Sequence, residues 1–414
     1  MKLDRDALTR LTYLQLGCYG YFIYGFGPTL SLLRDEQGVS RSVAGLHGTA
    51  LAVGSLLAAL IVAPLLRRHG RSTIVWSGMA GLCAGVLTYV SSTALPATLL
   101  GVTVAAFGGS FVVVSSAPVL SDRHGVSGPS AISEANAVAA GAGTVAPLVV
   151  GACVGLGLGW RPALLLLLPV VLVLAFAGRH VRAPSPAPVP HHIENGRLPR
   201  RFWISWAVVT AGIAVEFCLL LWTADVLREQ MGLAPGQAAA GLTALVAGMC
   251  VGRVAGGRLA LRFPLDQLLY AAILTTMAGF TVFWLAGTVV LGLPALLVCG
   301  LGIALFYPLG IARAIEASEG RPDQASARVG LGAALASGAA PFLLGAIADV
   351  VGIRLALLVV PALLVGAAIG IRVGRPGAPV GGGPYDAWDG ERSHGDQSRH
   401  EGRCGQERQS GRTR

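Results

Sequence analysis

The chain has 414 residues, of which 54% are hydrophobic and only 13% are charged, whereas an average soluble domain carries about 25% charged residues. This composition excludes an ordinary soluble protein, so the net charge of +10 is better explained by arginine-rich cytoplasmic loops of a membrane protein than by nucleic-acid binding. There is a single lysine, Lys2, so no G-K-[ST] phosphate loop exists and the chain carries no Walker-type ATPase.

Apolar runs long enough to cross a bilayer, about 20 residues in a helix, recur along the whole chain. The charged N-terminus leads into the first run without a cleavage pattern, so we expect a membrane helix there and not a removed signal. The runs lie at residues 11–33, 43–66, 73–93, 98–120, 131–156, 162–178, 202–226, 237–260, 266–288, 293–315, 328–348 and 355–371. The sequence therefore predicts an all-α membrane protein with twelve transmembrane helices in two six-helix halves, 1–178 and 202–372.

Two polar segments complete the chain. Residues 179–201 contain five prolines and five arginines, which predicts a solvated cytoplasmic linker. Residues 373–414 are rich in Gly, Arg, Ser and Asp and predict a disordered cytoplasmic tail. We expect the protein in the plasma membrane with both termini on the cytoplasmic side. In this topology all but five of the 31 Lys and Arg residues obey the positive-inside rule. The exceptions are Arg34, Arg41, Arg161, Arg228 and Arg354.

The two halves repeat each other at an offset of 194 residues. LRDEQGVS at 33–40 matches LREQMGLA at 227–234, and the same offset aligns Thr49-Ala50-Leu51 with Thr243-Ala244-Leu245. Near the end of each half, TVAPLVVG at 144–151 resembles GAAPFLLG at 338–345. A shared offset across both halves indicates duplication of a six-helix unit.

In span count, central loop, duplicated halves and motif positions, residues 8–372 resemble the major facilitator superfamily. The resemblance implies two parallel halves that rock about a substrate site near the middle of the membrane. It also implies that helices 1, 4, 7 and 10 line the central cavity.

The family's loop between helices 2 and 3, G-x-x-x-D-R-x-G-R, corresponds here to Ala63–Arg71, which matches at Arg68, Gly70 and Arg71 but carries Arg67 in place of the acid. The second-half equivalent retains Arg262 and also lacks the acid. The resemblance implies that Arg68, Gly70, Arg71 and Arg262 act in cytoplasmic gating. The alternative is that the loop arginines only set the topology.

Motifs of the family's drug–proton antiporters are weak. Helix 4 carries Val104 where those antiporters have an arginine, and helix 5 reads Ala142–Pro147 in place of G-x-x-x-G-P. A standard drug-antiporter assignment is weakened accordingly.

One acid interrupts the seventh apolar run. Glu216 lies 15 residues after Arg201 and 12 before Arg228, near the bilayer centre, where an acid costs roughly 2.5–3.5 kcal/mol. It shares a helical face with Ser205, Gly212 and Thr223. We predict that Glu216 couples proton movement or binds substrate. The alternative is a hydrogen bond that only ties helices together.

Further candidates lie on the cavity helices. Tyr21 and Tyr24 share a face of the first helix and could stack on an aromatic or cationic ligand; Trp222 and Tyr307 are similar candidates, and ordinary packing is the alternative. Arg313 and Glu316, at the inner end of the tenth helix, are predicted to belong to a cytoplasmic gate, or else to be solvated helix ends.

These features favour a secondary active transporter that works by alternating access and couples efflux of a small amphipathic organic molecule to protons. The alternatives are uptake of an organic anion or nutrient, and a transporter-like membrane sensor. No nucleophile–base set, metal cluster or disulfide framework is recognisable, so we expect no enzyme, cofactor or metal. The expected partners are a small-molecule substrate, the lipid bilayer and protons, without nucleic acid, and the protein is expected to be a monomer.

Overall fold

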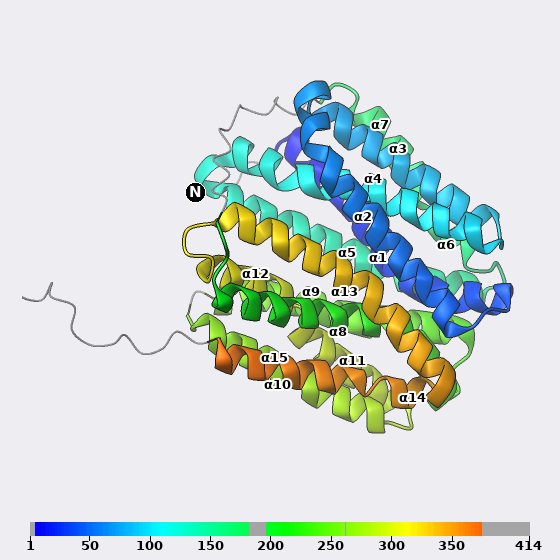
Figure 1. Ribbon diagram of the computed structural model, residues 1–414. Coiled ribbons are helices and arrows are strands. Elements are labelled where there is room, and N and C mark those ends of the chain that lie inside the picture. The colour runs from blue at the N-terminus through cyan, green and yellow to red at the C-terminus, as the bar shows by residue number, and fades with distance from the viewer. Residues whose placement is uncertain (1–4, 182–195, 261, 375–414) are drawn as a thin grey trace, which may run out of the picture. The chain divides into compact units, whose positions relative to one another are not determined.

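The computed structural model describes residues 5–181, 196–260 and 262–374, and almost all of them are α-helical (Figure 1). This confirms the predicted fold class. Most of the predicted linker and all of the predicted tail after residue 374 lie outside the described residues.

The first half consists of helices whose ends lie within a few residues of the predicted runs. They are α1 (Ala7–Gln37), α2 (Arg41–His69), α3 (Arg71–Ser91), α4 (Leu95–His124), α5 (Gly128–Gly155), α6 (Arg161–Leu165) and α7 (Leu167–Gly178), with a short 3-10 turn at Gly125–Ser127.

The second half follows the same order. Its helices are α8 (Arg200–Met231), α9 (Pro235–Leu259), α10 (Leu265–Leu285), α11 (Val289–Ile303), α12 (Phe306–Glu316), α13 (Pro322–Val351), α14 (Ile353–Ala356) and α15 (Val359–Val373). The predicted tenth span is thus broken between α11 and α12. The division of the chain into halves remains a prediction, and we use the two names for α1–α7 and α8–α15.

Eleven helical segments of the described chain are long and apolar enough to cross a membrane. The predicted first span is not among them, although α1 is 31 residues long. Tyrosine, glycine and threonine occupy much of α1 and reduce its hydropathy. Its 31 residues are long enough to cross a bilayer, and it packs against α5 and α8.

The repeated segment ends α1 and α8 in the same way. Gly38 and Gly232, which are 194 residues apart, both adopt left-handed backbone angles, with φ of 63° and 65°. This conformation ends a helix and is nearly free of strain only in glycine. The sequence repeat is therefore also a repeat of local structure.

We call the end of the bundle where α1 begins the near end, and the end where α1 stops the far end. The near end is the predicted cytoplasmic side. Between the halves, α2 packs on α13, α5 on α9 and α1 on α8.

Glycines bring these helix pairs into backbone contact toward the far end. A Cβ at Gly45 of α2 would lie 2.8 Å from the Cα of Phe342 in α13, and one at Gly151 of α5 would lie 2.5 Å from the carbonyl oxygen of Gly236 in α9. Small residues at such positions let membrane helices approach closely. Toward the near end, in contrast, a Cβ at Gly257 of α9 or Gly330 of α13 would meet nothing within 4 Å. The halves are therefore in closest contact at the far end.

Candidate functional site

Glu216 lies at the middle of α8, and its side chain is only 14% exposed. Its Oε1 lies 3.7 Å from Nη2 of Arg253 on α9. At this distance the two groups attract each other, but the contact is longer than a hydrogen bond. The central acid is thus held by a charge of opposite sign on the neighbouring helix.

Arg253 reaches this acid from the near-end side, since it lies six residues before the end of α9. Its side chain is 32% exposed. It also interacts with the hydroxyl of Tyr24 from the first half. Glu216, Arg253 and Tyr24 therefore form a polar cluster that includes both halves, and we call it the central cluster.

The ring of Tyr24 rests on a glycine of the first half. A Cβ at Gly143 of α5 would overlap that ring, so glycine is needed there for the ring to lie flat against α5. The central cluster is thereby bounded by α1, α5, α8 and α9. The resemblance had implied the first, fourth, seventh and tenth spans as the cavity lining, which correspond to α1, α4, α8 and α11–α12. The structure adds α5 and α9 to the helices around the central cluster.

Sequence reasoning missed Arg253. The signal was present, because an arginine seven residues inside an apolar run needs a polar partner in the membrane. Arg253 lies toward the predicted cytoplasmic end of its run, where arginines also set the topology, so its position alone does not reveal its pairing with the acid on the preceding helix.

The structure places the other aromatic candidates differently. The Tyr21 hydroxyl donates to the carbonyl oxygen of Ala163 at 2.7 Å, within the first half. Trp222 is buried, and its Nε1 donates to the carbonyl oxygen of Pro341 at 3.0 Å. Neither side chain belongs to the central cluster.

Tyr307 is 44% exposed near the start of α12. The preceding Phe306 packs on Gly212, one helical turn from Glu216. Tyr307 therefore lies at about the depth of the acid, next to the break between α11 and α12.

The remaining residues of the predicted polar face of α8 are occupied by packing. Ser205 accepts a hydrogen bond from Arg313, and Thr223 is fully buried. The polar face is thus reduced to Glu216 itself.

Among the described residues, the predicted gating residues of the first half form no hydrogen bond or ion pair with the second half. Arg68 is exposed at the end of α2. Gly70 joins α2 to α3 with a φ of 78°, and Arg71 pairs with Asp122 of α4 at 2.5 Å. These residues connect helices within one half.

The second-half candidates behave likewise. Arg313 is buried and donates to Asp266 at 2.8 Å, to Ser205 at 2.9 Å and to the carbonyl oxygen of Ile371 at 3.0 Å. It thereby joins α8, α10, α12 and α15. Arg262 and Glu316 are exposed.

Two further ion pairs at the near end also stay within the first half. Arg5 pairs with Glu134 at 2.9 Å and Arg123 with Asp6 at 2.7 Å. Partial burial alone would raise the pKa of Asp6, but hydrogen bonds from Thr9 and Arg123 outweigh it and lower that pKa.

Ion pairs between the halves lie instead at the far end. Asp225 of α8 has a fully buried side chain and pairs with Arg34 of α1 and Arg41 of α2. Arg41 also pairs with Glu229. In the opposite direction, Arg228 of α8 donates to Asp35 of α1 at 2.6 Å. We call these six residues the far-end network.

The repeated segment supplies much of this network. Arg34 and Arg228 are equivalent by the 194-residue offset, and each pairs with an acid of the other half. Both arginines were singled out in the sequence only as exceptions to the positive-inside rule.

A further carboxylate strengthens the far-end contact. Asp349 of α13 accepts the backbone N–H groups of Arg41 and Ser42, both at 2.8 Å. N–H groups in the first turn of a helix have no backbone acceptor within that helix. An acid of the second half therefore caps a helix of the first half.

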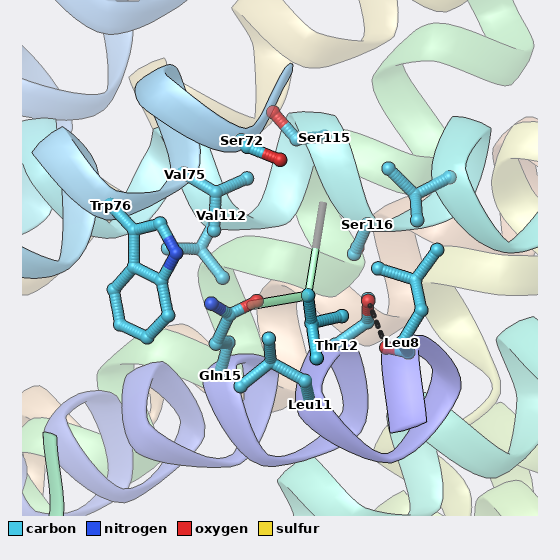
Figure 2. Close-up of a pocket in the computed structure, with 12 residues that line it drawn as sticks. Leu8, Leu11, Thr12, Gln15, Ser72, Val75, Trp76, Val112, Ser115 and Ser116 are labelled. Atoms are coloured by element: carbon cyan, nitrogen blue, oxygen red, sulfur yellow. Dashed lines mark hydrogen bonds between the residues drawn. The ribbon is translucent and has the colours of Figure 1, made fainter. Parts of the chain in front are cut away.

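Figure 2 shows a small pocket near the beginning of α1, between α1, α3 and α4. It is lined by Leu11, Thr12, Gln15 and Trp76 among others, and no lining residue is charged. The pocket lies within the first half and does not include the central cluster.

The family model of the Major Facilitator Superfamily matches residues 12–319. No curated protein matches the sequence.

Solved structures share the fold at low identity. A bacterial homologue of the human lysosomal transporter Spinster, in an inward-facing and occupied conformation, is 16% identical, with 90% of this chain and 97% of that chain covered and a TM-score of 0.74. A variant of the E. coli fucose:proton symporter FucP is 17% identical, with 89% of this chain and 100% of that chain covered and a TM-score of 0.59. Family match and fold agree that this chain belongs to the Major Facilitator Superfamily and is a multi-pass membrane transporter.

Proposed function

We propose that the chain is a secondary transporter of a small amphipathic organic molecule, that it works by alternating access, and that Glu216 couples this transport to protons. The observation that carries the proposal is the central cluster. In this cluster a carboxylate at mid-membrane is 14% exposed and paired with Arg253 of a neighbouring helix. An ionisable group at this depth is energetically costly, and such groups mark functional sites in membrane proteins.

The arrangement of the halves supports alternating access. The far end is closed by the far-end network and by glycine contacts, while the near-end ion pairs stay within one half. Rocking the halves apart at the far end would break the first set and leave the second intact. We propose that the state described is open toward the cytoplasmic side.

Two directions of transport are candidates. The aromatic and apolar lining of the cavity helices favours export of an amphipathic molecule in exchange for protons. The position of Arg253 favours the second candidate, uptake of an organic anion together with protons, because a guanidinium in a nonpolar environment selects for negative charge.

Replacement of Glu216 by glutamine is expected to abolish substrate-driven proton movement while leaving substrate exchange across the membrane possible, because the amide keeps the shape but does not ionise. The measurement is the internal pH of proteoliposomes supplied with a panel of amphipathic acids, amides and amines. Glu134→Gln, at the exposed near end, serves as the control.

Normal proton movement in Glu216→Gln would remove the coupling role. Binding without any flux in the wild type would favour the sensor. The sign of substrate accumulation in cells distinguishes import from export.

A further inference from the structure

The central cluster has a charge balance that selects its substrate. The ion-pair partner of Glu216 is Arg253, and Arg253 interacts in turn with Tyr24. Among the ion pairs of the described residues, Glu216 and Arg253 pair only with each other. With Glu216 ionised and Arg253 protonated, the site without substrate carries no net charge.

We propose that Arg253 binds the carboxylate of an organic acid with an apolar body, and that this carboxylate takes the place of the Glu216 carboxylate once Glu216 has accepted a proton. The inference rests on the proposed function and names the substrate class for that same site.

The geometry supports an exchange of partners at Arg253. Glu216 and Arg253 lie 3.7 Å apart without a hydrogen bond, so the guanidinium keeps donors available for a second carboxylate, which it can bind in a two-pronged fashion. Its side chain is 32% exposed, so a ligand can reach it. A single cationic side chain matches a single negative charge, which favours a carboxylate over a phosphate dianion.

The same charges enforce coupling. A proton alone would leave the site at +1 and an anion alone would leave it at −1, and a net charge buried within the membrane is costly. Proton and anion together restore neutrality. The proton moves from water to a carboxylate oxygen of Glu216, Arg253 stays protonated, and no bond other than that O–H forms. Both the empty and the fully loaded site are neutral, so proton and carboxylate travel in the same direction.

The net charge of the site also disfavours a cationic substrate. It would have to compete with Arg253 for the Glu216 carboxylate and would raise the net charge to +1. The apolar body of the ligand would lie against Tyr24, which is buried against α5.

The test is ligand binding to the purified full chain, measured by thermal stabilisation across pH. The probes are aryl and alkyl carboxylates such as 4-phenylbutyrate, each compared with its amide and its amine, which share the same apolar body. We expect the carboxylates alone to stabilise the wild type. Their affinity should rise as pH falls, by up to about tenfold per pH unit, because one proton is bound with each anion.

The variants separate the two roles. Arg253→Gln should weaken carboxylate binding by at least about tenfold, and Arg253→Lys should recover part of it. Glu216→Gln should bind carboxylates with little pH dependence, because Arg253 no longer has a competing carboxylate. Arg258→Gln, on the same helix and exposed, is the matched control and should bind as the wild type does.

Three results would overturn the inference: no carboxylate of the panel binds, amines bind in preference to carboxylates, or carboxylate binding survives in Arg253→Gln. If amines bind and still move protons through Glu216, the proposed function stands and this inference falls. If carboxylates bind through Arg253 but no protons move, the proposed function is the one that fails.

Discussion

Replacement of Asp225 by asparagine is expected to open the far end of the transporter. The Asp225 side chain is fully buried, and Arg34 and Arg41 beside it are 13% and 20% exposed. Removing one partner of a buried ion pair costs about 3–5 kcal/mol, and here Arg34 and Arg41 lose the buried carboxylate that they share. That penalty applies only while the halves are closed at the far end, since opening returns both arginines to water.

The equilibrium between the two states should therefore shift toward the far-open state by roughly 100-fold or more. Electron-spin distances between labels at Thr93 and Val350 report the change, because these exposed residues lie at the far end of the first and second half respectively. The distribution should move to longer distances. Glu134→Gln, which breaks a more exposed pair within the first half, should leave it unchanged. An unchanged distribution in Asp225→Asn would show that the far-end network does not hold the halves together.

Arg313→Ala is expected to lower the stability of the second half without changing the balance between the two states. Arg313 has a 6% exposed side chain and makes three hydrogen bonds that join four helices. Their loss leaves Asp266 and the Ile371 carbonyl without this donor, at an expected cost of about 3–5 kcal/mol. Thermal denaturation of the purified protein should show a midpoint several degrees lower.

The exposed Arg262 provides the comparison for that variant. Arg262→Ala should denature as the wild type does, because an exposed arginine contributes little. Arg313→Lys should recover only part of the loss, since an ammonium lacks the planar fork that meets three acceptors. If Arg313→Ala denatured normally and instead altered the Thr93–Val350 distances, Arg313 would be a gate, as its position at the end of the tenth span had suggested.

Helix order and boundaries could be predicted from the sequence, because apolar runs of membrane length are bounded by charges and glycines. Twelve spans were predicted, and eleven helical segments of the described chain are long and apolar enough to be spans. The sequence repeat corresponds to a repeat of structure and of charged residues. LRDEQGVS and LREQMGLA end two equivalent helices with left-handed glycines, Gly38 and Gly232, and supply the arginines that pair across the halves. What the repeat could not give was the partner of each arginine, since Asp225 has no acidic equivalent in the first half.

The candidate site could be predicted only in part. Glu216 stood out because a lone acid at mid-membrane is rare, whereas Arg253 was lost among many arginines near the predicted cytoplasmic end. The pairing of Arg253 with Glu216 is difficult to predict because the arginine side chain is long and flexible. It can start near one end of a helix and place its charge more than a helical turn away. Gates could not be located from the sequence either, because charges at helix ends look alike whether they pair within a half or between halves.

The central step of the proposed mechanism is the uptake of a proton by Glu216 when substrate binds. Its most direct test is the number of protons absorbed from weakly buffered solution when a bound carboxylate of the panel saturates the purified wild type, at a pH where Glu216 is ionised in the empty site. We expect uptake of about one proton per molecule, and none in Glu216→Gln. Carboxylate binding without proton uptake, or equal uptake in Glu216→Gln, would contradict the claim.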